Sequence, residues 1–128
     1  MRAFFLSRSH SFRNAFSGWW FVIRSQRNAW IHGLATVLVI ILGIWLGLST
    51  IEWSIIVLAI TLVWLTEFLN TALEAAVDLA SPQEHRLAKV GKDVSAAAVL
   101  ISALSSIVIG LLILGPPLLD KLKLLFAQ

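Results

Sequence analysis

The sequence predicts an all-α membrane protein in one domain, residues 1–128, with an N-terminal amphipathic surface helix and three transmembrane helices. Of its residues, 59% are hydrophobic and only 13% are charged, and the mean hydropathy is +0.88. A soluble domain of this size does not carry so much apolar surface. The apolar residues form three long runs, and a basic segment precedes them. The absence of cysteine excludes disulfides, thiolate chemistry and cysteine zinc sites.

The N-terminal segment, residues 1–28, carries five of the ten basic residues and no acidic residue. Between Phe12 and Ile23 its apolar residues, two tryptophans among them, recur at helical spacing. A basic, tryptophan-bearing amphipathic helix lies in the membrane interface. The net charge of +3 therefore indicates membrane topology and lipid headgroups, and no nucleic-acid partner is expected.

Three segments are predicted to cross the bilayer, at about residues 30–48, 51–79 and 94–119. The first is close to the roughly 20 residues that span the hydrocarbon core, and the second is longer. We therefore expect the last turns of the second segment to emerge at the interface. The run Gly115-Pro116-Pro117 is expected to end the third segment. That segment also has a ridge of small residues that favours close helix packing: Ala98, Ser102, Ser106 and Gly110.

The distribution of basic residues predicts the orientation. Residues 1–28 contain five, the loop at residues 80–93 contains three, the first link contains none and the tail contains two. Lys and Arg accumulate on the cytoplasmic side of membrane proteins. The N-terminus and the loop at 80–93 are therefore expected in the cytoplasm, and the C-terminus outside.

An acidic stripe in the second transmembrane segment is the strongest candidate site. Four polar residues follow one another at steps of three or four: Glu67, Asn70, Glu74 and Asp78. On a helix this spacing places them in one narrow stripe. Acidic residues beside the hydrocarbon layer are costly, so they indicate a functional site by default. Charges solvated at a helix end would explain Asp78, but not Glu67, which follows a charge-free run beginning at Trp53.

Carboxylates and an amide near a basic loop favour a divalent metal and a phosphate group. Mg²⁺ prefers oxygen ligands, often one or two carboxylates completed by phosphate oxygens. Lys92 would contact phosphate as a point charge, and another carboxylate would accept the proton of an attacking hydroxyl. A proton or cation path also uses intramembrane carboxylates, so an ion-conducting helical oligomer is the alternative function. Among the histidines, His85 is a site candidate, whereas His10 and His32 are expected at the membrane interface.

Three runs carry a resemblance to a known family: EFLNTALEAAVD, SPQEHRLAK and GKDVSAAAVL. They resemble the small prokaryotic lipid kinases, the diacylglycerol kinase and undecaprenol kinase family, and the likeness covers nearly the whole chain. It implies a homotrimer in the bacterial inner membrane that transfers the γ-phosphate of ATP to a lipid hydroxyl with Mg²⁺. The implied active sites lie at subunit boundaries near the cytoplasmic interface. The implied lipid is undecaprenol or diacylglycerol, and the loop resembles the undecaprenol kinase branch more.

The resemblance also implies residue roles. Glu67 would be the general base, with Asn70 shaping the site, and Glu74 would be a metal ligand. The implied nucleotide contacts are Asp78, His85, Lys92 and Asp93. Two positions depart from the family, since Gln26 replaces a glutamate that helps to hold metal and Gln83 replaces a loop glutamate. The Gln26 amide keeps an oxygen ligand but loses the charge, which leaves a catalytically weakened kinase as a further alternative.

Overall fold

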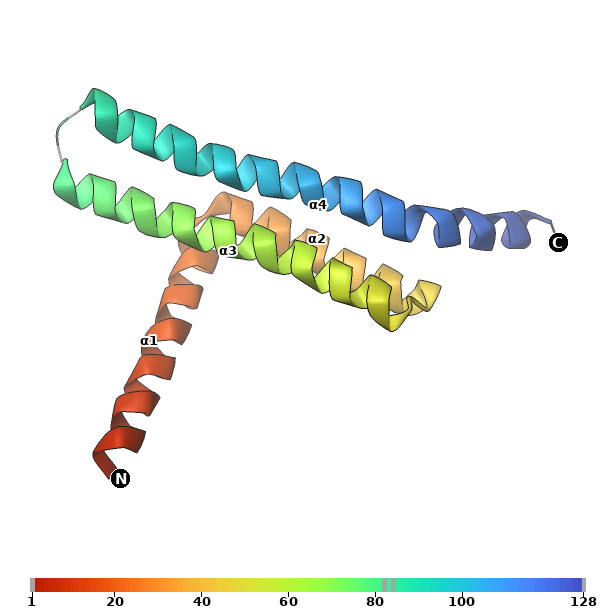
Figure 1. The fold of residues 1–128 in the computed structure, drawn as a ribbon, viewed down its shortest axis with the longest axis horizontal. Helices are drawn as coiled ribbons and strands as arrows, with labels where there is room; N and C mark the ends of the chain where they lie inside the picture. Colours follow the sequence, from red (N-terminus) through yellow and green to blue (C-terminus); the bar gives the residue numbers. More distant parts are fainter. Residues whose placement is uncertain (1, 82, 84, 128) are drawn as a thin grey trace.

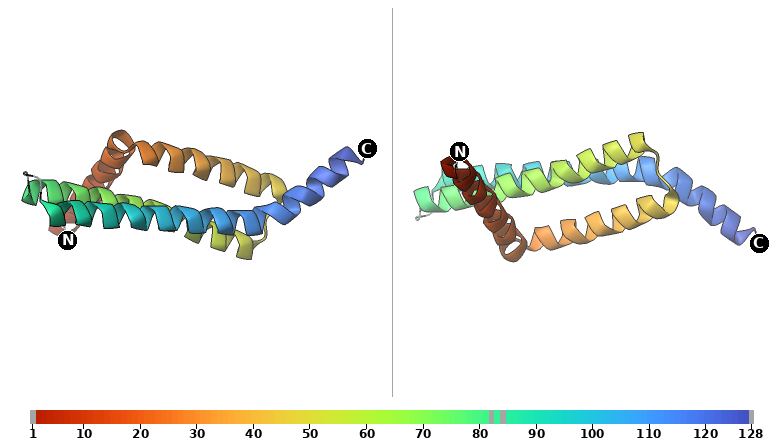
Figure 2. Two further views of the ribbon diagram at one scale, coloured as in Figure 1. Left: turned by 90° about the horizontal axis from the view of Figure 1, so that it is seen from above. Right: turned by 90° about the horizontal axis from the view of Figure 1, so that it is seen from below.

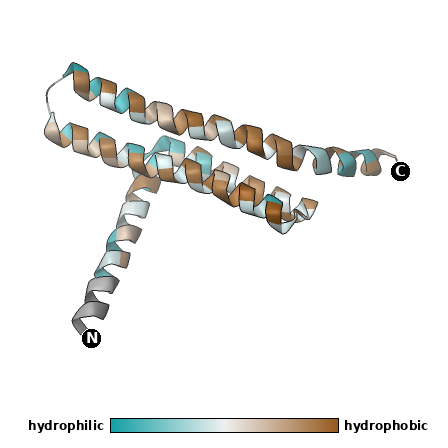
Figure 3. Ribbon diagram, viewed as in Figure 1, coloured by the Kyte–Doolittle hydropathy of each residue, from teal (hydrophilic) through white to brown (hydrophobic). Residues whose placement is uncertain are grey.

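The computed structural model describes residues 2–81, 83 and 85–127. Throughout these residues the regular structure is helical, in the order α1 (Arg2–Ser25), α2 (Arg27–Leu46), α3 (Thr50–Ala80) and α4 (Arg86–Phe126) (Figure 1). Helices α2, α3 and α4 are long and apolar enough to cross a membrane. Hydrophobic residues dominate the middle of α4, and hydrophilic residues occur toward both of its ends (Figure 3). These features confirm the predicted class, an all-α membrane protein with three spanning helices.

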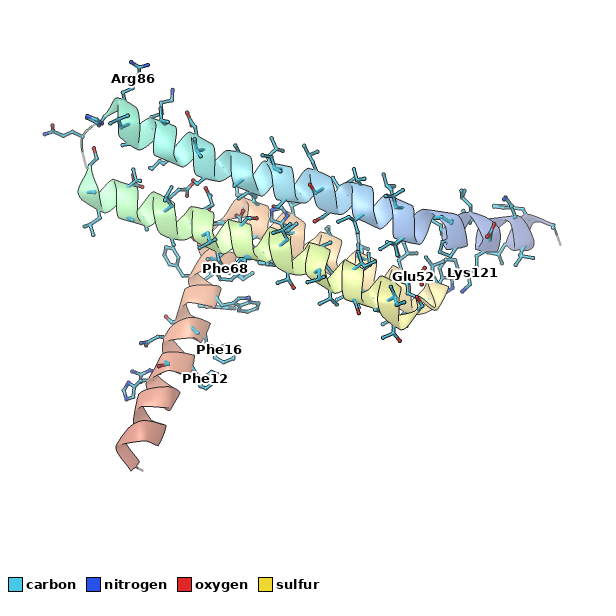
Figure 4. The ribbon with its side chains drawn as sticks, in the orientation of Figure 1. Phe12, Phe16, Glu52, Phe68, Arg86 and Lys121 are labelled. Carbon is cyan, nitrogen blue, oxygen red and sulfur yellow. The ribbon has the colours of Figure 1, made fainter. Side chains whose placement is uncertain are left out.

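Helix α1 points away from the other three helices (Figure 1). Phe12 and Phe16 project from the same side of it and are 67% and 69% exposed (Figure 4). The chain then turns at Gln26, whose extended backbone (φ −102°, ψ 120°) separates α1 from α2. Val22 and Ala29 are buried on the two sides of this turn and fix the junction. A divergent helix with an exposed apolar side suits the predicted position in the membrane interface.

Helices α2 and α3 form an antiparallel hairpin with a tightly built turn. Gly47 ends α2 in the left-handed conformation, with φ of 75°, which glycine adopts without a steric penalty. Ser49 then begins α3 as one half of a capping box, because its backbone N–H donates to Glu52 Oε2 at 2.7 Å. The Trp53 ring packs directly over Gly43, so the turn and the two helix ends form one packed unit.

Helices α3 and α4 run antiparallel and share the most extensive contact between elements (Figure 1). Thr66 Oγ1 and Ser102 Oγ are hydrogen-bonded at 2.7 Å, and Ser106 Oγ donates to the carbonyl of Ala59 at 3.1 Å. The small-residue ridge therefore packs against α3 of the same chain at Ser102 and Ser106. At Gly110 an added Cβ would meet open space.

The predicted boundaries at the start of α4 were wrong. The loop was expected to run from 80 to 93, but α4 already begins at Arg86. His85 caps it, because His85 Nδ1 accepts the backbone N–H of Leu87 at 3.2 Å. Lys92 and Asp93 consequently lie within the helix, where their side chains point in different directions around the axis. The charged residues before Val94 had concealed the helix, because they lower its hydropathy.

The helix also does not end at Gly115-Pro116-Pro117 as expected, because α4 continues through Pro116 and Pro117 to Phe126. Proline removes a backbone donor and bends a helix, and α4 changes direction toward its C-terminal end (Figure 2). Ending the helix within the membrane would leave more backbone groups without partners than bending it does. Beyond the bend, Lys121 Nζ donates to the Trp45 carbonyl and lies 4.5 Å from the centre of the Trp45 ring (Figure 4).

Candidate active site

Glu74 is held by two amide groups from different parts of the fold. Gln26 Nε2, at the α1–α2 turn, donates to Glu74 Oε2 at 3.4 Å, and Asn70 Nδ2 donates to Glu74 Oε1 at 3.2 Å. Asn70 is 7% exposed, and its Oδ1 accepts from Ser95 Oγ of α4 at 2.6 Å. The predicted site residues Gln26, Asn70 and Glu74 are therefore in contact, and the network fixes the direction of the Glu74 carboxylate.

Glu67 lies deeper in the membrane segment and is completely buried. Neither of its carboxylate oxygens has a hydrogen-bond partner among the described residues. Buried polar groups are nearly always hydrogen-bonded, and an unpartnered buried carboxylate is costly. This carboxylate is therefore available to a group that the chain itself does not provide, as the role of a general base requires.

His32 lies opposite Glu67, a contact that was not predicted for it. Its Nε2 atom is 3.8 Å from Glu67 Oε2, its side chain is 14% exposed, and Nε2 also has no hydrogen-bond partner in the described part of the chain. Hydropathy alone does not identify this residue. The contact is a property of the fold, because the two residues lie on different helices of the α2–α3 hairpin and are not equally distant from its turn.

A cleft of about 700 Å³ opens where α3 ends and α4 begins. Its lining is rich in charge, with the carboxylate Asp78, the imidazole His85 and three cations: Arg86, Lys89 and Lys92. Lys92 Nζ forms an ion pair with Asp78 Oδ1 across the two helices. Arg86 projects from the first turn of α4 (Figure 4). Clustered cations are the usual partners of phosphate groups.

Of the four predicted nucleotide contacts, three line this cleft and one does not. Asp78, His85 and Lys92 are brought together, whereas Asp93 is exposed and lies outside the cleft lining. The loop residues Pro82 and Glu84 lie outside the described residues. Gln83, the second departure from the family pattern, lines the cleft and is exposed.

Ser95 connects the cleft to the Glu74 network and was missed in the sequence. Its hydroxyl lies 2.9 Å from the Lys92 carbonyl and 2.6 Å from Asn70 Oδ1. The available signal was its spacing, because Ser95 follows Lys92 by three residues and so shares its helix face. The cleft, the Glu74 network and the buried Glu67 thus follow one another along α3, from the helix end into the membrane.

The surroundings of Glu74 suit a metal ion that arrives with a phosphate, rather than one enclosed by protein. The described residues contain no group of three or more His, Asp or Glu side chains that could hold a metal. Mg²⁺ commonly needs only one or two protein carboxylates, because water and substrate phosphates complete its shell. The Glu74 carboxylate and the amide of Gln26 beside it fit such a site.

The sequence matches the family described as prokaryotic diacylglycerol kinase over residues 13–114. The chain belongs to this family. It is 45% identical over 108 residues to the undecaprenol kinase of Bacillus subtilis, with 84% of this chain and 88% of that protein covered. It is 43% identical over 111 residues to a diacylglycerol kinase of Synechocystis, with 86% of this chain and 63% of that protein covered.

A third relative is the diacylglycerol kinase of Escherichia coli K12, 32% identical over 92 residues, with 66% of this chain and 75% of that protein covered. Membership of this family confirms the predicted function class, a membrane lipid kinase. The matched residues 13–114 extend from α1 into α4 and include each predicted site residue.

Proposed function

We propose that this protein transfers the γ-phosphate of ATP to the hydroxyl of undecaprenol, with Mg²⁺, at the cytoplasmic face of the bacterial inner membrane. The observation that carries the proposal is the complete burial of Glu67 with both carboxylate oxygens unpartnered among the described residues. A structural carboxylate at this depth would be paired, because an unpaired one is destabilising. A carboxylate that receives a proton from a substrate must be free to do so.

In the proposed reaction, Glu67 accepts the hydroxyl proton of the lipid as the hydroxyl oxygen forms a bond to the γ-phosphorus. The bond from that phosphorus to the oxygen bridging the β- and γ-phosphates breaks, and ADP leaves with the electron pair. General-base catalysis of this kind contributes about 10²- to 10⁴-fold to the rate. The Asn70 side chain, locked between Glu74 and Ser95, sets the distance between the base and the phosphate site.

The cleft at the end of α3 is the proposed nucleotide site. When ATP binds, Lys92 would leave its ion pair with Asp78 and contact phosphate oxygens instead. Asp78, His85 and Asp93 would contact the rest of the nucleotide. Glu74 and Gln26 would hold Mg²⁺, which supplies charge neutralisation on the β- and γ-phosphate oxygens when it is bound. Asp93 lies outside the cleft of its own chain, which supports a homotrimer in which a neighbouring subunit completes each site.

Undecaprenol is proposed ahead of diacylglycerol on two grounds. The B. subtilis relative named an undecaprenol kinase aligns over more of its own length than the Synechocystis diacylglycerol kinase does, 88% against 63%. The loop from Ser81 to Lys89 also resembles the undecaprenol kinase branch. The cytoplasmic placement rests on basic residues, because α1 and the start of α4 carry most of them.

The test is phosphate transfer from labelled ATP by detergent-purified protein, offered undecaprenol and diacylglycerol in parallel, with and without Mg²⁺. Labelled undecaprenol, dependent on Mg²⁺, is the expected result. Label on diacylglycerol alone would keep the kinase but replace its substrate. Absence of label in both tubes, from a folded oligomer, would contradict the proposal and indicate Gln26 as a disabling change.

A further inference from the structure

Three buried polar atoms face one another between α2 and α3 without partners in the described chain: His32 Nε2, Glu67 Oε1 and Glu67 Oε2. His32 Nε2 and Glu67 Oε2 are 3.8 Å apart, which is too long for a direct hydrogen bond. It is somewhat shorter than the roughly 4.5 Å expected when one oxygen atom bridges two hydrogen-bonding atoms, so a hydroxyl bound there would push the two side chains slightly apart. A hydroxyl oxygen about 2.8 Å from each atom would form an open triangle with both.

A hydroxyl group also matches these atoms chemically. It would donate a hydrogen bond to the Glu67 carboxylate, which is only an acceptor when ionised, and accept a hydrogen bond from an Nε2–H of His32. Satisfying both atoms removes the desolvation cost that the fold now bears. A carboxylate would not serve both partners, since the carboxylate of a ligand would repel that of Glu67.

An apolar cavity of about 450 Å³ begins at His32 and continues between α2, α3 and α4. On α4 its lining reaches Leu118, and on α2 it extends from Ile31 to Leu42, about 16 Å at the helical rise of roughly 1.5 Å per residue. Figure 2 shows that α2 is separated from α3 and α4 over this stretch and approaches them at the turn. The cavity therefore leads from His32, which lies next to Glu67, along the membrane-spanning direction.

The other two polar side chains of the cavity lining are already satisfied. Thr36 Oγ1 donates to the His32 carbonyl at 2.7 Å and accepts from Trp64 Nε1 at 3.2 Å. Ser106 Oγ donates to the carbonyl of Ala59. Beyond His32, the cavity thus offers contact to hydrocarbon and no free donor among its described lining residues for an ester carbonyl.

We propose that the substrate hydroxyl binds between His32 Nε2 and Glu67, and that the hydrocarbon attached to it enters the cavity between α2, α3 and α4. His32 is then a substrate-binding residue that positions the hydroxyl for the base. This inference rests on the proposed function and adds the class of alcohol, one whose carbons next to the hydroxyl are plain hydrocarbon. Ester groups near the hydroxyl would lose their water in this cavity without gaining a hydrogen bond.

Binding is tested without the reaction, by observing the imidazole ¹⁵N signals of the purified protein in micelles. Undecaprenol is compared with a polyisoprenoid hydrocarbon that lacks the hydroxyl, and His32→Gln identifies the His32 signals. The expected result is a shift of the His32 Nε2 signal with the alcohol alone, while the exposed His10 does not respond. An unchanged His32 signal, or equal shifts with both probes, would overturn the inference.

Kinetics separates positioning from a structural role. His32→Phe should raise the KM for undecaprenol by roughly three- to tenfold, the equivalent of one neutral hydrogen bond, with the KM for ATP unchanged. His32→Gln, which keeps a donor near the Nε2 position, should recover part of this loss, and His10→Ala is the matched control. Equal losses in both His32 variants would overturn the inference.

The two proposals fail separately in these experiments. If no phosphate is transferred but the His32 signal responds to the alcohol, the hydroxyl site stands and the kinase reaction is wrong. If phosphate is transferred and His32 does not respond, the kinase reaction stands and the hydroxyl site is wrong.

Discussion

At the residue scale, the three carboxylates on one face of α3 have three different environments. Glu67 is fully buried beside His32 without a hydrogen-bond partner among the described residues, Glu74 is half-buried and receives two amide donors, and Asp78 is largely exposed and paired with Lys92. The environments change in order from the membrane interior to water. Burial and existing contacts determine which further partners a carboxylate can take. The three residues therefore suit different roles, as proton acceptor, metal ligand and nucleotide contact respectively.

Replacing Glu67 with Gln tests the role of proton acceptor. The substitution preserves shape but removes the acceptor, so phosphate transfer should fall about 10²- to 10⁴-fold while the oligomer still assembles. Transfer is measured with labelled ATP, and assembly by size-exclusion chromatography in detergent. Asp120→Asn is the matched control, because Asp120 is an exposed carboxylate near the other end of the chain. Full activity in Glu67→Gln would rule out Glu67 as the base.

Gln26→Glu tests the metal site at the position that departs from the family. A second carboxylate beside Glu74 should lower the Mg²⁺ concentration for half-maximal rate by at least roughly fivefold, since a unit charge 4 Å away contributes about 1 kcal/mol even in water. The measurement is the rate as a function of Mg²⁺ at saturating ATP and lipid.

Asn28→Asp is the control for Gln26→Glu, because it adds the same charge two residues away on an exposed side chain. If both variants change the Mg²⁺ dependence equally, the effect is general electrostatics. Gln26 would then have no place among the metal ligands.

At the element scale, helix ends determine how the spanning helices meet. The left-handed Gly47, the Ser49–Glu52 capping box and the contact of Trp53 with Gly43 fix the α2–α3 turn. That turn determines which residues face each other farther along the hairpin, including His32 and Glu67. A small change at the turn should therefore affect both stability and the site, although the two are far apart in sequence.

Gly43→Ala should destabilise this turn. An ideal Cβ there would lie 2.9 Å from Trp53 Cη2, so the indole must shift, and such overpacking typically costs about 1–3 kcal/mol. Thermal unfolding in detergent, followed by circular dichroism, should show a lower midpoint. Gly110→Ala is the matched control, because its Cβ meets open space and alanine favours the helix. Equal midpoints for the two variants would show that Gly43 and Trp53 are not closely packed.

At the scale of the whole molecule, periodicity and hydropathy were sufficient to predict the spans and the acidic stripe. Both are local properties of the chain, as is the spacing from Glu67 to Asp78. The start of α4 was missed because its first turns are charged, and its passage through Pro116 was missed because the membrane penalty for ending a helix is not a local property. His32 was missed for a related reason, since its partner lies on another helix.

The same limit applies to assembly. Helices α3 and α4 of one chain pack extensively against each other, and Asp78 and Lys92 line the cleft at their ends. Asp93 lies outside this cleft. A partner for Asp93 would have to come from outside this chain, which the pattern of a single chain does not specify. The proposed homotrimer supplies such a neighbour, so the function of the cleft and the assembly should be tested together.

Lys92→Ala tests whether the cleft serves a nucleotide. Loss of one charge-assisted hydrogen bond to phosphate, about 1.5–3 kcal/mol, should reduce kcat/KM for ATP by roughly 10- to 100-fold. Lys123→Ala is the matched control, because it removes an exposed Lys–Asp ion pair, Lys123 with Asp120, at the other end of α4. Exposed ion pairs contribute little to stability, so the control should retain both its activity and the proposed trimer.

An oligomer that conducts ions along the acidic stripe would need Glu67 and Glu74 but not Lys92. If Lys92→Ala has unchanged ATP kinetics while Glu67→Gln loses activity, the nucleotide does not bind in this cleft.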